Sequence, residues 1–400
     1  MSANRGKLAI HGGNPVRDTY LSYGKQWISM QDIEAVVQTL QSPFLTQGPR
    51  LKEFEEAVAD KVGAKYAVAF SNGTAALHGA CYAAGITAGD EVITTPMTFA
   101  ASANCVRYCG GTVVFADIRP DTYNIDSQKI RSLITPRTRA IIPVDFTGQP
   151  AELSEIMEIA REYNLLVIED AAHSLGASYK GKRVGSIADM TMLSFHPVKH
   201  ITTGEGGIIT TNSKDLYNKL LLFRSHGITR EASYMHKQSE GPWYYEMVDL
   251  GYNYRMTDLQ AALGRSQIEK LDEFVNRRRQ IVSEYNQRFA NNPFIKIPYQ
   301  LDGCDSSWHI YVIQLNLENL VVGRKEIFEA LIAENIGVNV HYIPVHLHPY
   351  YQNLGYKRGI APTSEWLYER ILTLPLFPAM IDQDVEDVIA GVEKVLSYYG

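Results

Sequence analysis

Asp170 follows an apolar stretch at a point where a strand is expected to end. In LLVIED-AAHS, residues 165–174, the small side chains of Ala171 and Ala172 leave room beside the Asp170 carboxylate. A carboxylate in this position could pair with a protonated ring nitrogen of a bound ligand. It could equally cap a helix, because Asp often accepts a hydrogen bond from the first N–H groups of a helix. The residues alone leave both interpretations open.

A lysine occurs in similar surroundings in SFHPVKHITTGEGG, residues 194–207. A single lysine in a loop is usually a solvated surface charge. Lys199, however, lies between the apolar runs MTMLSF and GGIITT, and most of its neighbours are small or uncharged. Partial loss of ammonium solvation would lower the pKa of Lys199 and provide a nucleophilic amine. Ser194, five residues earlier, has a hydroxyl group suited to binding a phosphate.

Three further candidate positions follow other expected strands. In FSNGTAALHGA, a strand ends and a helix begins near Thr74, so that the free N–H groups of the helix could bind an anion and Gly73 would allow close approach. Such turns are common, and this one gains meaning only together with Asp170 and Lys199. Phe99 and His173 could lie on opposite faces of a ligand ring. Alternatively, Phe99 packs in the core and His173 is a structural histidine.

The elements that must position these residues alternate between strands and helices. Short apolar runs rich in β-branched residues predict strands at AVAF, EVITT, TVVFAD, AIIPVD, LLVIED, MTMLSF and GGIITT, and helical patterns lie between several of them, at Ala75–Ala84, Ala101–Cys109 and Glu152–Tyr163. This alternation predicts an α/β fold with a mainly parallel sheet covered by helices on both faces. Ligands of such sheets bind at the carboxyl ends of the strands, which is where the candidate residues lie.

The pattern changes after about residue 216. Helices are expected at Asp258–Leu271, at Glu273–Phe289, near Lys325–Glu334 and near Gln383–Tyr399, with the segments IYVIQLNL and NVHYIPVH between them. These elements predict a smaller C-terminal α+β domain. We therefore expect a large domain over residues 26–275 and a small domain over 276–400. The first 25 residues have no strong pattern, and we expect them to dock on the small domain.

The composition excludes several classes of protein. A net charge of −6 argues against general nucleic-acid binding, which requires a basic face. Cys105 and Cys109 have no histidine pair nearby, so we expect no metal site and interpret the four cysteines as reduced thiols. The N-terminus lacks an apolar run of signal-peptide length, and no stretch approaches the length of a membrane span. We expect a cytoplasmic protein with no membrane partner.

At these motifs the sequence resembles the DegT/StrS-type sugar-nucleotide aminotransferases, which are pyridoxal 5′-phosphate (PLP) enzymes of fold type I. The resemblance covers almost the whole chain and rests on FLTQGPRLKEFE, SNGTAAL, VIEDAAHS, SFHPVKHITTGEGG and LGYNYRMTDLQAALG. The terminal segments SYGKQWISMQDIEAVV and VNVHYIPVHLHPYY are similar to members that act in pseudaminic acid synthesis. This narrower similarity implies amination at C4 of a UDP-linked 4-keto-6-deoxy-N-acetylhexosamine, with L-glutamate as donor and 2-oxoglutarate as product.

The resemblance also implies roles for particular residues. Lys199 would hold PLP as a Schiff base and carry protons, and Asp170 would pair with the pyridine nitrogen. Gly73, Thr74 and Ser194 would bind the phosphate, while Phe99 and His173 would flank the ring. Asn253 would reach the phosphate of a neighbouring subunit's cofactor, which implies a homodimer with shared active sites. The nucleotide-sugar would lie near Gln47, His341, Tyr342 and His346. The residue that binds the carboxylate of the amino donor could be Arg224, Arg230 or Arg255.

Other functions compete with this interpretation. Sugar dehydrases of the same family have histidine in place of the lysine, whereas this chain has Lys199 with His200 beside it. A catalytically silent sugar-nucleotide-binding protein would not need the combination of Lys199, Asp170, Ser194 and Gly73. Aminotransferases acting on dTDP-linked or 3-keto sugars remain open alternatives.

Overall fold

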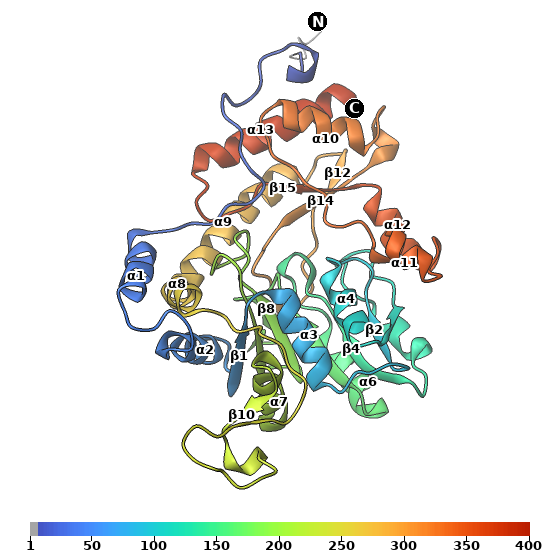
Figure 1. Ribbon diagram of the computed structural model, residues 1–400. Helices are drawn as coiled ribbons and strands as arrows, with labels where there is room; N and C mark the ends of the chain where they lie inside the picture. Colours follow the sequence, from blue (N-terminus) through green and yellow to red (C-terminus); the bar gives the residue numbers. More distant parts are fainter. Residues whose placement is uncertain (1–6) are drawn as a thin grey trace, which may run out of the picture.

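The computed structural model describes residues 7–400. Its central sheet has seven strands, and helices lie around it (Figure 1). All neighbouring strands from β8 to β3 are parallel, whereas β9 is antiparallel to both of its neighbours, β1 and β8. The prediction of an α/β fold with a mainly parallel sheet is confirmed. The strand order is β1 (Tyr66–Phe70), β9 (Gly207–Thr211), β8 (Met190–Ser194), β5 (Leu166–Asp170), β4 (Thr138–Ile142), β2 (Glu91–Thr94) and β3 (Thr112–Phe115).

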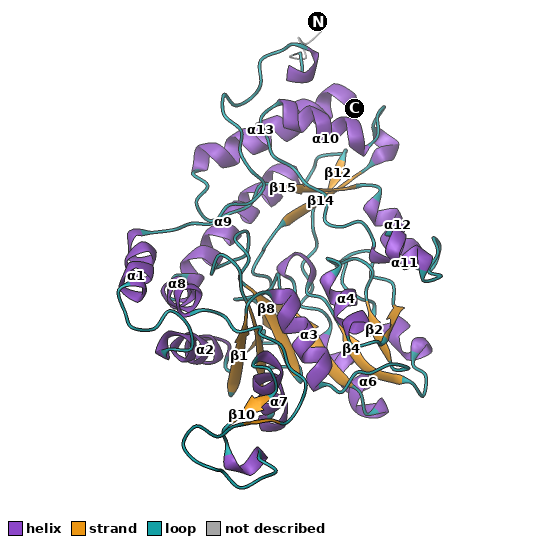
Figure 2. Ribbon diagram, in the orientation of Figure 1, coloured by secondary structure: helices purple, strands orange, loops and turns teal. Residues whose placement is uncertain are grey.

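Alternate residues of the strands face two different helical layers. Val68 and Ile168 pack with one layer, whereas their neighbours Ala67 and Val167 point to the other. This alternation follows from the two-residue repeat of a strand and buries the sheet on both faces. One face is covered by α3 (Gly73–Ala83), α4 (Ala101–Tyr108) and α7 (Lys214–Arg224), and the other by α2 (Pro49–Val62), α6 (Leu153–Tyr163) and α8 (Asp258–Ile268) (Figure 2).

A second, smaller core is built on an antiparallel sheet of three strands. β14 (Tyr311–Leu315) lies between β12 (Ile295–Lys296) and β15 (Ile371–Leu374). The helices α10 (Arg324–Ala333) and α13 (Asp382–Tyr399) pack with this sheet (Figure 1). Within residues 7–400, no helix combines the length and the apolar character needed to cross a membrane.

The N-terminal segment packs against the small core. Leu8 and Leu21 are buried in it, and the backbone N–H of Ala9 donates to Glu334 Oε1 at 2.9 Å. The N–H of Leu21 donates to the carbonyl of Asn335 at 2.9 Å. We therefore propose that residues 7–25 dock on the small domain, while residues 1–6 of the expected segment fall outside the described range.

The helix α9 (Leu271–Phe289) contributes to both cores. Its first turns bury Leu271 and Phe274 against the large core, and its later turns bury Ile281 and Tyr285 in the small core. We therefore propose that the division between the domains runs through α9, as an expected boundary near residue 275 implies. A continuous helix across the division fixes the two cores relative to each other more firmly than a loop would.

The remaining elements are short. The segment NVHYIPVH, expected to form regular structure, is mostly irregular, with one backbone bridge between Asn339 and Thr373. The small pieces are α1 (Met30–Leu40), α5 (Ser127–Ile130), α11 (Pro349–Asn353), α12 (Pro362–Tyr368), the pair β10 (Ile228–Thr229) and β11 (Glu246–Met247), and a sheet of β6 (Ser178–Tyr179), β7 (Lys182–Arg183) and β13 (Cys304–Asp305).

Candidate active site

A cleft of about 1020 Å³ lies at the carboxyl ends of β5 and β8. Its floor comes from the large domain, and residues 339–342 of the small domain form the facing wall. The structure thereby brings together residues that are far apart in the sequence. The candidates that line the cleft are Gly73, Thr74, Phe99, Asp170, His173, Ser194, Lys199, His341 and Tyr342.

One end of the cleft can bind an anion. α3 begins there at Gly73, and Asn72 caps the helix by accepting from the N–H of Ala75 at 2.9 Å. The preceding N–H groups have no intrahelical acceptor. A Cβ at Gly73 would stand 3.5 Å from Ser194 Oγ, and a Cβ at Gly207 would stand 2.6 Å from Gly73 Cα. The contact at Gly73 would be an ordinary one, whereas a side chain at Gly207 would collide with the backbone of α3, so Gly207 allows β9 and the helix start to meet closely beside the Ser194 hydroxyl, where a phosphate could bind.

Asp170 is the last residue of β5 and is buried. The Ser102 hydroxyl donates to Asp170 Oδ2 at 2.5 Å, and the N–H of Ala172 donates to Oδ1 at 3.2 Å. Burial raises the pKa of Asp170, although these donors and the nearby Lys199 oppose the increase. The chain after Asp170 forms turns rather than a helix, so the helix-capping interpretation is wrong. The carboxylate can instead receive a cationic N–H from within the cleft.

Lys199 lies on the connection between β8 and β9, and it is not a solvated surface charge. Its Nζ is 3.3 Å from Nε2 of His309, within hydrogen-bond distance. Burial and, to a smaller extent, Arg278 lower the pKa of Lys199 to about 7, against the opposing effect of Asp170. At neutral pH a large fraction of this side chain is therefore a free amine. The position combines nucleophilic and basic character with access to the cleft.

The aromatic candidates lie above this floor. Phe99 is 61% exposed, which excludes core packing, and its ring centroid is 6.2 Å from that of Tyr342. His173 is buried, and its Nε2 is 3.0 Å from the Tyr342 hydroxyl. Burial and then Lys199 hold the pKa of His173 well below its usual range, so the ring is neutral. Burial likewise lowers the pKa of His341 to about 3.

Three candidates lie outside the cleft of their own chain. Gln47 and Asn253 are exposed and do not line it. His346 is fully buried, and its Nε2 is 2.8 Å from Glu365 Oε1. The expectation that His346 lies near the sugar is therefore wrong. His346 is only five residues from His341, but the chain turns between them and directs the His346 side chain into the interior.

The arginine candidates for the donor carboxylate also lie elsewhere. Arg224 is buried and pairs with Glu55, and it donates to the carbonyl of Ala69 at 2.8 Å. The guanidinium carbon of Arg230 lies 6.0 Å from the ring centroid of Tyr245. Neither these two nor Arg255 lines the cleft of the described chain. No arginine of residues 7–400 lines the cleft, so any of these arginines could bind the donor only by moving into place or by reaching in from another subunit.

Four residues at or behind the cleft were not anticipated from the sequence. Tyr23 and His309 line it, Ser102 bonds Asp170, and Arg278 is fully buried behind His309. The spacing of these residues relative to Lys199 carries no recognisable signal, because they come from the N-terminal segment, α4, α9 and the start of the small sheet. Only the folded chain brings them together.

The arrangement fits PLP. A turn that could bind an anion, a buried carboxylate without a cationic partner at hydrogen-bond distance within residues 7–400, and an amine with a lowered pKa converge on one cleft. These match the phosphate, the ring nitrogen and the aldehyde of the cofactor. Nδ1 of His173 is also buried without a hydrogen-bond partner among the described residues, as expected of a group that faces a ring rather than the protein.

Comparisons with known proteins agree with this geometry. Residues 26–393 match the DegT/DnrJ/EryC1/StrS aminotransferase family. The chain is 43% identical to the spore coat polysaccharide biosynthesis protein SpsC of Bacillus subtilis, over 95% of this chain and 98% of that protein. It is 39% identical to the UDP-4-amino-4,6-dideoxy-N-acetyl-beta-L-altrosamine transaminase of Campylobacter jejuni, over 95% and 99% of the two chains.

A solved structure has the same fold. Helicobacter pylori PseC, an aminotransferase involved in the biosynthesis of pseudoaminic acid, superposes with a TM-score of 0.89 and 32% identity, covering 95% of this chain and 100% of that one. The identity, the coverage and the cleft point to one conclusion. The chain belongs to the DegT/DnrJ/EryC1/StrS aminotransferase family, and it is a sugar aminotransferase whose cofactor is pyridoxal phosphate.

Proposed function

We propose that this enzyme transfers an amino group from L-glutamate to C4 of a UDP-linked 4-keto-6-deoxy-N-acetylhexosamine. The main support for amino-group transfer is the position of Lys199, whose pKa is lowered to about 7 in a cleft that also contains Asp170 and the turn at Gly73. The products would be the 4-amino sugar and 2-oxoglutarate.

Each group in the cleft has a defined task. Gly73, Thr74 and Ser194 would bind the phosphate, and Asp170 would hold a proton on the ring nitrogen. When bound, pyridoxal phosphate supplies an electron sink for the substrate carbon that loses a proton. Lys199 would hold the cofactor and, once displaced by an amine, would remove and return protons at Nζ. Because a histidine cannot form the covalent bond, Lys199 favours transamination over dehydration.

The sugar assignment is supported by relatives rather than by contacts. The Campylobacter jejuni relative is named for a UDP-linked amino sugar, and the Helicobacter pylori protein is an aminotransferase involved in the biosynthesis of pseudoaminic acid. The cleft offers a wall of hydrogen-bonding and aromatic side chains, namely Tyr23, Asn339, His341 and Tyr342, which suits a pyranose ring.

A second substrate deserves a test because of a specific comparison. The Bacillus subtilis relative, named for spore coat polysaccharide biosynthesis, is slightly more similar to this chain than the Campylobacter jejuni enzyme. A different nucleotide-linked keto sugar, dTDP-linked or carrying the ketone at C3, is therefore the alternative.

The substrate proposal is tested by a matched screen. Purified holoenzyme is incubated with glutamate and either UDP- or dTDP-linked 4-keto-6-deoxy sugars, and 2-oxoglutarate and the amino sugar are quantified together. We expect the UDP-linked N-acetyl sugar to give the highest kcat/KM. A higher value with a dTDP-linked sugar would overturn the substrate assignment, and a dehydrated product without 2-oxoglutarate would overturn transamination.

We further propose that the active form is a homodimer in which Asn253 reaches the neighbouring site. Asn253 is exposed, yet its backbone is held by a bridge to Ser225. Several large apolar side chains between residues 27 and 45 are also exposed, as expected of a surface that a second copy covers. These residues are Trp27, Ile28, Met30, Ile33, Val37, Leu40, Phe44 and Leu45.

Mixed subunits test the shared site. Lys199→Ala and Asn253→Ala subunits, each impaired alone, are combined under conditions that allow exchange. A heterodimer would contain one site of two with both residues intact, and random exchange of equal amounts makes half of the dimers heterodimers, so activity should return to roughly a quarter of the parent value. If native mass spectrometry shows that heterodimers have formed but no activity returns, Asn253 does not act across the interface.

A further inference from the structure

His309 touches the amine on which the proposed reaction depends, and no role has yet been given to it. Its side chain is buried and precedes β14, so that it belongs to the small domain while facing the floor of the large one. The distance of 3.3 Å between His309 Nε2 and Lys199 Nζ is the polar side-chain contact that the structure gives Lys199.

The backbone around His309 is held in a strained conformation. Trp308 has a φ of 52°, which is uncommon for a bulky residue and is maintained only where its surroundings require it. Those surroundings are visible. Arg278 Nη1 donates to the carbonyls of His309 at 2.9 Å, Leu376 at 2.8 Å and Trp308 at 3.3 Å. The N–H of Trp308 donates to Ser306 Oγ at 3.1 Å.

Arg278 is therefore committed to the backbone of this segment. It is fully buried, and it forms no ion pair with a carboxylate among the described residues. Only Nη1 makes hydrogen bonds, since Nε and Nη2 have no partner among the described residues. Because burying a guanidinium without a counter-ion is costly, the carbonyls that Nη1 binds offset part of this cost, and these bonds tie α9 to the backbone of Trp308 and His309. These contacts hold the backbone of His309 so that its ring lies beside the Lys199 amine.

The charge state of His309 suits a contact with an amine. Burial, followed by the positive charge of Lys199, keeps the pKa of His309 well below its usual range, so the imidazole is neutral. A neutral imidazole can donate to the lone pair of a free amine or accept from its N–H. Nδ1 has no partner among the described residues, which leaves the contact through Nε2 as the polar interaction of the ring.

We propose that His309 is a further catalytic residue, which holds the free amine of Lys199 in place whenever Lys199 is not bonded to the cofactor. This inference rests on the proposed function. Lys199 would bond to the cofactor by adding Nζ to its aldehyde carbon with loss of water, and the amine of the donor would later replace Nζ. After the exchange Lys199 is a long, unattached side chain. A contact at Nζ reduces the freedom it would otherwise gain and keeps it beside the carbon whose proton it must move.

The experiment measures bond formation and proton transfer separately in His309→Ala and His309→Gln. The cofactor is first removed, and PLP is added back. Quenching of protein fluorescence reports non-covalent binding, and the violet absorbance band reports the bond to Lys199. Glutamate with deuterium or hydrogen at the α-carbon is then added to the loaded enzyme, and the decay of the band is followed in a single half-reaction.

We expect His309→Ala to slow both bond formation and the half-reaction by roughly 10- to 100-fold, with binding by quenching unchanged. The deuterium effect should increase because proton transfer becomes slower than the other steps. His309→Gln, which keeps a hydrogen-bonding group, should recover part of the rate. His200→Gln is the matched control: His200 is also buried, but its Nε2 is 3.1 Å from the carbonyl of Ser307. It should affect melting temperature rather than the isotope effect.

The outcomes separate the inference from the proposed function. If the parent protein forms no violet band, the proposed function fails. If the parent forms it and both His309 variants match the parent within twofold in bond formation, half-reaction and isotope effect, the inference alone is overturned. A loss in His309→Ala that tracks its melting temperature and is reproduced by His200→Gln would also overturn it, because a structural role would explain both.

Discussion

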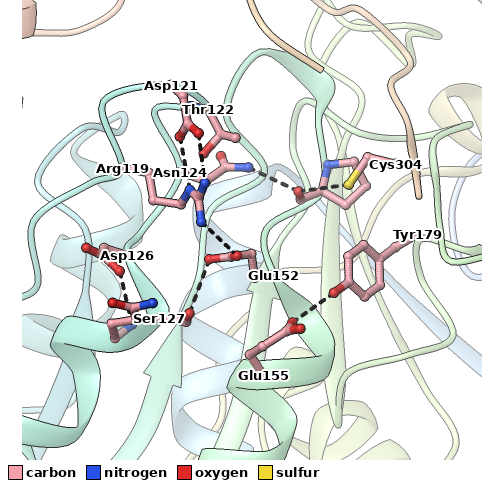
Figure 3. A network of polar contacts seen from close by, with 12 residues as sticks. Arg119, Asp121, Thr122, Asn124, Asp126, Ser127, Glu152, Glu155, Tyr179 and Cys304 are labelled. Atoms are coloured by element: carbon pink, nitrogen blue, oxygen red, sulfur yellow. Dashed lines mark hydrogen bonds and ion pairs between the residues drawn. The ribbon is translucent and has the colours of Figure 1, made fainter. Parts of the chain in front are cut away.

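Two polar clusters of this enzyme differ in how fully their charges are paired. Beside the sheet, Arg119 donates to both carboxylate oxygens of Asp121, at 3.0 and 2.7 Å, and to Glu152 at 3.0 Å (Figure 3). Glu152 also accepts from the Ser127 hydroxyl at 3.1 Å. This cluster joins loop residues to the start of α6, and each charge in it has a partner.

The cleft shows the opposite arrangement. Lys199 contacts a neutral histidine instead of a carboxylate, Asp170 accepts from a hydroxyl and one N–H, and Arg278 donates only to carbonyls. Burial moves the pKa of Lys199 down and that of Asp170 up, so both charges are disfavoured. A cluster that satisfies its own charges stabilises the fold, whereas one that leaves them unsatisfied is prepared for a ligand that supplies the missing partners.

The largest effect should come from Lys199→Ala. We expect turnover to fall by roughly 10³-fold or more, because both the covalent attachment and the proton carrier are lost. Non-covalent PLP binding should persist through the anion-binding turn. Amino-sugar formation and PLP binding by dialysis are the two measurements, and activity near the parent value would refute the assignment of Lys199.

Asp170→Asn should reduce turnover by roughly 10²- to 10³-fold while sparing the fold. Asparagine retains an acceptor for the N–H of Ala172 and removes a carboxylate that burial disfavours, so the melting temperature should not fall. Rates and melting curves are compared on the same preparation. Parallel losses of activity and stability would instead indicate that Asp170 is mainly structural.

The pH dependence of stability should distinguish the cleft from the paired cluster. The folded-state pKa of Lys199, about 7, lies below the unfolded value near 10.5. Below pH 7 Lys199 is protonated in both the folded and the unfolded protein, so the folded protein bears the full free-energy cost of burying the charged ammonium group. Between these values the unfolded state binds more protons, so stability rises with pH relative to a variant without the amine.

Lys199→Met supplies that comparison in cofactor-free protein. It should melt at a higher temperature than the parent at pH 7, and the difference should narrow towards pH 10. Thermal melts at several pH values measure both. A difference that stays constant with pH would mean that the amine is not charged and desolvated in the way described.

The smallest effect on catalysis is expected from Arg119→Ala. This change leaves partly buried Asp121 and Glu152 without their cation and should cost about 1–3 kcal/mol of unfolding free energy. Because the cluster lines no part of the cleft, kcat should stay within twofold of the parent. Denaturant unfolding and steady-state rates test this, and a large loss of kcat at unchanged stability would remove the distinction between the clusters.

Local sequence patterns predicted much of the large domain. Apolar runs marked all seven strands of the central sheet. Asp170 at the end of β5 and Lys199 after β8 both line the cleft. The antiparallel direction of β9 could not be predicted, because an apolar run such as GGIITT indicates a strand without indicating its direction relative to its neighbours. The segment containing Lys199 is therefore a connection between antiparallel neighbours, held from both ends.

The small domain and the far wall of the cleft were harder to predict. NVHYIPVH has the composition of a strand, but only Asn339 makes a backbone bridge, and His346 turns into the interior to meet Glu365. His309 and Arg278 gained meaning only from tertiary contacts with Lys199 and with carbonyls distant in sequence. Periodicity reports which face of an element is buried, and it does not report which side chains from separate elements meet.

The most direct test of this account is chemical fixation of the cofactor. The purified enzyme is loaded with PLP, reduced with borohydride, digested and mapped by mass spectrometry. We predict a single phosphopyridoxyl adduct on Lys199, and none on the exposed Lys180 or on the Lys199→Ala protein. An adduct on a different lysine, or loaded protein that yields no adduct, would contradict the claim that Lys199 is the amine around which the cleft is built.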